Sequence, residues 1–173
     1  MNFELNQEQR AIQELARGFA AKELAPFAAA WDESCTFPID TLRKAAGLGL
    51  AAIFIAEDVG GSGFGRMEGA LIFEALAEGC ASTAAFLSIH NMAGSMIDTY
   101  GDQAQRKRWL PAMATMELIA SYCLTEPGAG SDAAALATRA RRDGDDYILN
   151  GTKAFISGRS EEHTSELQSH LNL

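Results

Sequence analysis

Apolar residues in the N-terminal part of the chain recur at the spacing of helix faces. Asn6 and Gln9 form the pattern of a capping box, and the apolar residues after it share one stripe of a helix. These residues are Ile12, Leu15, Ala16, Phe19 and Ala20. The sequence therefore predicts a first helix that begins near Asn6 and buries one face.

The same spacing predicts further helices, separated by turn residues. The first turns Leu42 and Ala46 inward and ends at Gly47, and the second covers 67–77. The third is capped by Ser82 or Thr83 and ends at Gly101. The fourth is capped by Asp102 and is disturbed by Pro111. The segment 31–38 is predicted to be a loop, and the apolar segment 48–55 a connector. His90 lies on the inward stripe of the third of these helices, and this stripe contains residues from Phe86 to Tyr100. We interpret it as a core residue with satisfied hydrogen bonds rather than a substrate contact.

From Glu117 onward the pattern changes from helical to extended. Asp143-Gly144 and Asn150-Gly151 are hairpin turn signals on either side of an apolar strand. The predicted fold class is therefore α+β: an all-α domain over 1–116, followed over 117–158 by the first antiparallel strands of a truncated β-domain. Such a sheet would keep an unpaired edge where further strands belong.

Composition narrows the function classes. The formal net charge is −9 and 47% of the residues are hydrophobic, which favours a globular protein and argues against nucleic acid as a partner. The basic run 106–108 is expected to be a solvated helix face. Cys35, Cys80 and Cys123 are widely spaced and odd in number, which suits a reducing compartment and argues against a disulfide framework or a zinc site. No segment has the pattern of a membrane span or a signal peptide, which predicts a cytoplasmic protein or one whose organelle leader is missing.

The segment 121–132 consists of a short, mostly apolar stretch followed by a glycine-rich one. Ser121 to Thr125 is predicted to be extended, and Pro127 prevents its regular continuation. Gly128 and Gly130 leave a nearly bare backbone that a ligand could approach, and glycine tolerates the positive φ that such turns often need. For the glycines alone, a loop without a ligand is the simpler interpretation. The glycines at 60–65 do not match G-x-G-x-x-G, so a dinucleotide fingerprint is rejected.

The whole string 122–132, Tyr-Cys-Leu-Thr-Glu-Pro-Gly-Ala-Gly-Ser-Asp, is far more specific, and it resembles the signature of the acyl-CoA dehydrogenases. The segments 73–77, 88–92 and 147–158 resemble the branched-chain branch of the same family, and the resemblance runs continuously from residue 1 to 158. It implies a flavoprotein oxidoreductase that uses FAD to oxidise the Cα–Cβ bond of an acyl-CoA. The chain would correspond to the N-terminal part of such an enzyme, with the C-terminal helical domain absent.

The resemblance also implies which residues bind the cofactor. Tyr122, Cys123, Leu124 and Thr125 would lie along the flavin ring, with the Thr125 hydroxyl near N5 and main-chain groups of Leu124 and Thr125 at the pyrimidine edge. Gly130 and Ser131 would approach the diphosphate, and Ser131 would also contact the CoA part of the substrate. Phe155, Ile156 and Ser157 would cover the flavin from the next strand. From the sequence alone, Phe155 could equally be an aromatic residue of a sheet core.

No catalytic residue is assigned, because in this family a glutamate from the C-terminal half removes the α proton. The implied parent reaction is α,β-dehydrogenation of a short branched-chain acyl-CoA, with isobutyryl-CoA in valine catabolism as the expected substrate. The implied partners are the acyl-CoA, an electron-transferring flavoprotein and further copies of the subunit in a homotetramer. The implied location is bacterial cytoplasm or mitochondrial matrix. Alternatives are a straight-chain acyl-CoA substrate, an oxidase of the same fold, and a non-catalytic, partly folded fragment.

After Gly158 the resemblance ends, and Arg159 begins a polar segment that resembles the in-frame translation of a sequencing adapter. We therefore expect 159–173 to be a non-native tail without stable contacts to the rest of the chain. For this reason Glu166 is not assigned as a catalytic base, and His163 and His170 are not assigned as metal ligands. No metal ligands are assigned elsewhere in the chain.

Overall fold

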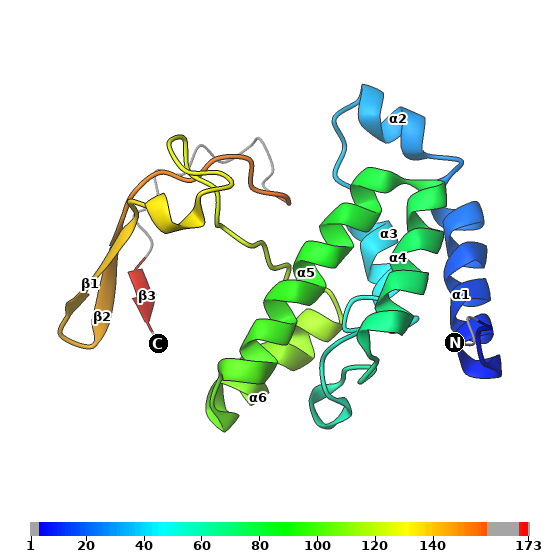
Figure 1. The fold of residues 1–173 in the computed structure, drawn as a ribbon, viewed down its shortest axis with the longest axis horizontal. Helices are drawn as coiled ribbons and strands as arrows, with labels where there is room; N and C mark the ends of the chain where they lie inside the picture. Colours follow the sequence, from blue (N-terminus) through cyan, green and yellow to red (C-terminus); the bar gives the residue numbers. More distant parts are fainter. Residues whose placement is uncertain (1–3, 159–169, 173) are drawn as a thin grey trace. The chain divides into compact units, whose positions relative to one another are not determined.

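The computed structural model describes residues 4–158 and 170–172. The chain divides into two compact units, Met1–Ala120 and Ser121–Leu173, here called the helical unit and the sheet unit (Figure 1). The α+β prediction is confirmed, because helices fill the first unit and antiparallel strands the second. None of the described helices is long and apolar enough to cross a membrane.

The helical unit contains α1 (Gln7–Phe19), a π-helical turn η1 (Ala20–Leu24), α2 (Ala28–Glu33), α3 (Ile39–Ala46), a 3-10 turn η2 (Glu57–Val59), α4 (Arg66–Gly79), α5 (Ala81–Tyr100) and α6 (Gln103–Ala114). α4 packs against both α1 and α5 (Figure 1). The predicted caps of α1 and α6 are confirmed: Asn6 with Gln9, and Asp102 with Gln105, form complete capping boxes. Each box satisfies N–H groups that a helix start leaves without partners.

Several local predictions are wrong. Leu15 is 43% exposed, because the inward stripe of α1 is narrower than the sequence pattern. Trp31 lies in α2 rather than in a loop. α5 begins directly after Cys80, ahead of Ser82 and Thr83, and neither side chain caps it. On the same helix, Met96 and Tyr100 are exposed rather than inward.

The apolar connector is largely buried from Leu50 to Ile55, and one amide side chain organises it. Asn91 of α5 accepts a hydrogen bond from Ile53 N at 2.6 Å and donates to Leu50 O and Leu87 O, both at 2.9 Å. The side chain is fully buried. It therefore satisfies Ile53 N and Leu50 O, two backbone groups of the irregular segment that have no helical partner, as burial requires.

The glycine-rich loop after η2 folds back along this connector. Ser62 N, Gly63 N and Phe64 N donate to carbonyls of Ala52, Ile55 and Ile53 respectively. Gly61 permits the close approach, because a Cβ there would lie 2.0 Å from the Ile55 carbonyl oxygen. The loop is therefore held by the fold itself.

Arg106 fastens the start of this loop to α5 and α6. Its guanidinium pairs with Asp58 at 2.8 Å and with Asp98 at 2.8 Å, and only 13% of its side chain is exposed. The hydrogen bonds that Arg106 donates to Asp58 and then to Asp98 raise the pKa of Arg106. The prediction of a solvated basic face is therefore wrong at Arg106, while Lys107 and Arg108 are exposed.

Beyond α6 the chain turns at Met116, a non-glycine residue with φ 58°. Leu118 N donates to Ala112 O across this turn, which satisfies a carbonyl at the helix end. The Met116 side chain is fully buried in the main core cluster. That burial offsets the cost of a left-handed backbone where glycine is usual.

The sheet unit contains a 3-10 turn η3 (Ala133–Ala135) and strands β1 (Arg139–Asp143), β2 (Asp146–Asn150) and β3 (His170–Asn172), paired antiparallel in the order β1-β2-β3. The hairpin signal at Asp143-Gly144 is confirmed: Asp143 pairs with Asp146, and Gly144 has φ 66°. The signal at Asn150-Gly151 ends β2 but joins it to no adjacent strand in the described chain. The segment 121–125 forms no strand either.

β3 contradicts part of the expectation for the tail. Its residues pair with β2, with Ile148 opposite His170 and Asp146 opposite Asn172. The outer edge of β2 offers backbone groups that any extended segment can pair with, and this requires no particular side chains. Of the tail positions considered above, Glu166 and His163 lie outside the described residues.

Candidate functional site

The glycine-rich string forms a tight turn. Glu126 N donates to Ala129 O at 3.0 Å, and Ala129 N donates to Glu126 O at 3.1 Å, so Pro127 and Gly128 lie at the tip. Contrary to the expectation from sequence, neither Gly128 nor Gly130 has a positive φ. A Cβ at either position would meet nothing within 4 Å. Neither backbone conformation nor packing within the described residues requires these glycines, which leaves an open backbone face.

Glu126 is the hub behind this turn. Only 6% of its side chain is exposed, and it accepts hydrogen bonds from Ala137 N at 2.6 Å, Thr138 N at 3.0 Å and Lys153 Nζ at 2.9 Å. Hydrogen bonds from Thr138, Lys153 and Ala137 lower the pKa of Glu126 to about 2. Glu126 is therefore a fixed anion that joins three segments of the chain.

Lys153 brings the two predicted cofactor segments together. Its Nζ donates to Leu124 O at 2.9 Å as well as to Glu126, and the adjacent Ala154 N donates to Thr125 O at 2.9 Å. The segments 122–125 and 155–157 therefore leave from one cluster of polar contacts. We call Glu126, Lys153 and the amides of Ala137 and Thr138 the polar clamp.

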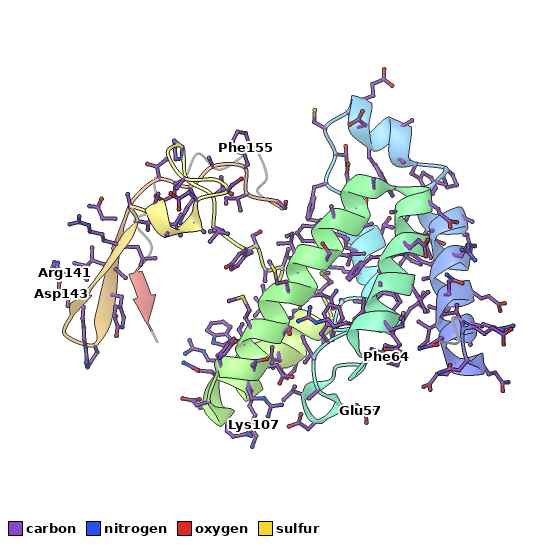
Figure 2. All side chains as sticks on the ribbon, viewed as in Figure 1. Glu57, Phe64, Lys107, Arg141, Asp143 and Phe155 are labelled. Atoms are coloured by element: carbon purple, nitrogen blue, oxygen red, sulfur yellow. The ribbon has the colours of Figure 1, made fainter. Side chains whose placement is uncertain are left out.

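Phe155 leaves the clamp with its ring in solvent (Figure 2). The side chain is 94% exposed and its φ is 55°, in the left-handed region that non-glycine residues seldom occupy. The interpretation of Phe155 as a sheet-core aromatic is therefore wrong, and the segment that carries it is not a strand. An exposed aromatic ring on strained backbone is a feature of binding sites.

The remaining predicted residues divide by exposure. Half-buried are Tyr122, Leu124, Thr125 and Ile156, and exposed are Cys123, Gly130, Ser131 and Ser157. The carbonyls of Leu124 and Thr125 accept bonds from Lys153 Nζ and Ala154 N respectively, whereas their own N–H groups donate to no acceptor among the described residues. The Thr125 hydroxyl also has no partner there. The free groups at this edge are thus mainly donors.

His90 is a core residue, as predicted. Ala120 N donates to its Nδ1 at 3.0 Å, so Nε2 carries the proton and donates to Met113 O at 3.1 Å. Burial lowers the pKa of His90, against smaller opposing effects of these backbone contacts. The ring therefore stays neutral and ties the C-terminal end of the helical unit to α5 and α6.

Sequence reasoning missed the two charged residues of the clamp. Glu126 lies inside the recognised string and Lys153 in the second recognised segment, but their pairing spans residues far apart in sequence. The only signal in the sequence was that each recognised segment contains a charged residue, Glu126 in the first and Lys153 in the second. Within the described part of the chain, no group of three or more His, Cys, Asp or Glu side chains could hold a metal ion.

Comparison with known proteins identifies the fold family. The acyl-CoA dehydrogenase N-terminal domain matches residues 6–117, and the acyl-CoA dehydrogenase middle domain matches residues 121–164. The chain belongs to the acyl-CoA dehydrogenase family. The match therefore begins in the helical unit and continues through the glycine-rich string and the clamp.

Similar proteins include enzymes and ligand complexes. Mitochondrial isobutyryl-CoA dehydrogenase of Bos taurus is 55% identical over 157 residues, which cover 91% of this chain and 38% of that protein. The structure of a glutaryl-coenzyme A dehydrogenase with glutaryl-CoA matches with a TM-score of 0.85 and 32% identity, over 90% of this chain and 40% of that one. Glutaryl-CoA dehydrogenase of Mycobacterium smegmatis with FADH2 matches with a TM-score of 0.83 and 35% identity, over 88% and 39%. The chain thus spans about two fifths of these relatives.

Proposed function

We propose that this chain supplies the helical and cofactor-facing part of an FAD-dependent dehydrogenase that acts on isobutyryl-CoA. The observation that carries the proposal is the clamp, which brings residues 122–125 and 155–157 together beside an open glycine backbone. The 55% identity to the bovine isobutyryl-CoA dehydrogenase supports the branched-chain substrate. The solved FADH2 complex of a relative supports the cofactor.

The described residues fit a flavin. The N–H groups of Leu124 and Thr125 would donate to the carbonyl-rich edge of the ring, the Thr125 hydroxyl would hold the N5 side, and Phe155 would cover a ring face. Gly130 and Ser131 would face the diphosphate, with Ser131 also near CoA. When bound, FAD would accept the hydride from the substrate Cβ. The residues of this chain would bind and orient the flavin. They would exclude water from it only once the exposed Phe155 ring is covered.

No described residue of this site is suited to remove the α proton. Glu126 is the buried carboxylate between the two segments, but with a pKa of about 2 it is a very weak base. We therefore propose that the chain of 173 residues alone does not turn over acyl-CoA, and that the base comes from elsewhere in the parent protein. The parent would pass its electrons to an electron-transferring flavoprotein and form a homotetramer, in the mitochondrial matrix or in bacterial cytoplasm.

The test is to express the gene from its source locus and to assay the purified product. We expect bound FAD and faster reduction of a dye acceptor with isobutyryl-CoA than with straight-chain acyl-CoAs of similar length. The chain of 173 residues, assayed in parallel, should show no turnover. A flavin-free product, or one that prefers a straight-chain substrate, would refute the corresponding part of the proposal. Genomic codons for Arg159 to His170 would show that the tail is native.

A further inference from the structure

Lys153 places a positive charge at one end of the peptide unit that joins Leu124 to Thr125. Its Nζ lies 2.9 Å from the Leu124 carbonyl oxygen, and only 12% of its side chain is exposed. The N–H at the other end of this peptide unit belongs to Thr125, and it donates to no acceptor among the described residues. A cation on the carbonyl and a free donor thus share one amide.

A hydrogen bond from a cation draws electron density toward the carbonyl oxygen of an amide. The N–H of the same amide then becomes a stronger donor, because hydrogen bonds in a chain polarise one another. Low exposure of Lys153 limits screening by water. The Thr125 N–H should therefore be a better donor than the N–H of an ordinary exposed peptide.

Glu126 fixes the geometry of this arrangement. It accepts from Lys153 Nζ at 2.9 Å while the Ala137 and Thr138 amides hold it from the other side. The ammonium therefore cannot swing away into solvent, and the bond from Ala154 N to Thr125 O fixes the next peptide unit. The donor is fixed in direction as well as strengthened.

We propose that Lys153 is a positioning residue that makes the Thr125 N–H a strong donor to an electron-rich acceptor of a planar heteroaromatic cofactor. This inference rests on the proposed function for the identity of the ligand, but the polarisation itself belongs to the chain alone. A donor strengthened in this way favours a ring that gains negative charge over the same ring without it. Lys153 would thus affect cofactor affinity without touching the cofactor.

The first test needs no cofactor. In ¹⁵N-labelled chain of 173 residues, we expect the Thr125 amide proton to move upfield in Lys153→Met and to stay near its original position in Lys153→Arg. Lys107→Met, on an exposed lysine of the helical unit, is the matched control and should leave it unchanged. If Lys153→Met does not fold, the double variant Glu126→Gln with Lys153→Met removes both buried charges together. An unmoved Thr125 resonance in whichever of these variants folds would overturn the inference.

The second test is an FAD titration of the same samples, followed by the Leu124 and Thr125 amides. We expect the dissociation constant to rise about tenfold in Lys153→Met and to change little in Lys153→Arg, an effect equal to about 1.4 kcal/mol. Equal weakening by both variants would overturn the inference. If FAD moves no amide of residues 121–131 in the original chain while the Lys153 effect on Thr125 persists, the polarisation stands and cofactor binding by this chain is refuted.

Discussion

The helical unit buries two clusters of apolar side chains, whereas the described part of the sheet unit buries only Glu126 and Ala129. The first unit therefore gains its stability mainly from removal of apolar surface from water. The second is organised by hydrogen bonds and a buried ion pair, which contribute little net stability but fix geometry. The residues that we propose to hold the cofactor therefore lie where the apolar core is smallest.

The largest effect should come from a cavity in the helical unit. Leu76→Ala removes a fully buried side chain from the main cluster and should lower the free energy of unfolding of that unit by about 2–5 kcal/mol. Urea unfolding followed by tryptophan fluorescence would measure it, because Trp31 and Trp109 both lie in this unit. Leu15→Ala, at a position 43% exposed, is the control and should cost much less. Equal losses would contradict the assignment of the core.

A polar substitution in the same core should cost nearly as much. Asn91→Ala leaves Ile53 N and Leu50 O buried without their partner, so we expect a loss of about 2–3 kcal/mol. The exposed Asn150 of β2 gives the matched variant, Asn150→Ala, which should change stability by less than about 0.5 kcal/mol. A neutral Asn91→Ala would mean that water replaces the amide. Hydrogen exchange of the Ile53 amide would show this directly.

Acid should weaken the two units in different pH ranges. The pKa of buried His90 is lowered below its ordinary 6.5, so the unfolded chain takes up a proton first and the helical unit loses stability as the pH falls below about 6.5. Glu126 has its pKa lowered from 4.5 to about 2, so its contribution to the sheet unit is lost only between those values. Urea unfolding measured between pH 7 and pH 2, monitored by tryptophan fluorescence for the helical unit and by the Tyr147 resonances for the sheet unit, separates the two ranges. A slope that persists in His90→Gln would contradict the role of His90.

The smallest effect concerns Thr125, whose role should be chemical rather than structural. In the parent enzyme, Thr125→Val keeps the shape and removes the hydroxyl that the proposed function aims at flavin N5. We expect FAD to remain bound while flavin reduction slows about tenfold, which corresponds to about 1.4 kcal/mol of transition-state stabilisation. Stopped-flow reduction with isobutyryl-CoA would measure this. An unchanged rate in a fully flavinated variant would make Thr125 a structural residue.

Local signals predicted much of the fold. Asn6 with Gln9 and Asp102 with Gln105 start helices because a cap depends only on neighbouring residues. The prediction that Leu15 is buried was wrong, because the helices packed against a stripe decide which of its residues are buried. The prediction that Arg106 lies on a solvated face was wrong, because its partners Asp58 and Asp98 are distant in sequence or on another helix.

The candidate site was predicted less completely for the same reason. The string 122–132 marks one of the two proposed cofactor segments and 155–157 the other, but single segments do not reveal what joins them. The bonds from Lys153 to Leu124 and from Ala154 to Thr125 exist only in the folded chain. The sequence also could not predict that Gly128 and Gly130 lack a positive φ, since glycine permits both signs of φ.

The left-handed backbone at Phe155 lowers the stability of the fold, while the side chain is the one proposed to contact the flavin. A phenylalanine at φ 55° costs on the order of 1 kcal/mol that glycine would not, and its 94% exposed ring gains nothing from burial within the described chain. Phe155→Gly would thus be a natural choice for an engineer who seeks a more stable protein. It would also remove the aromatic ring that the proposed function places against the flavin. At this position, optimisation of the fold alone and optimisation of the function select different amino acids.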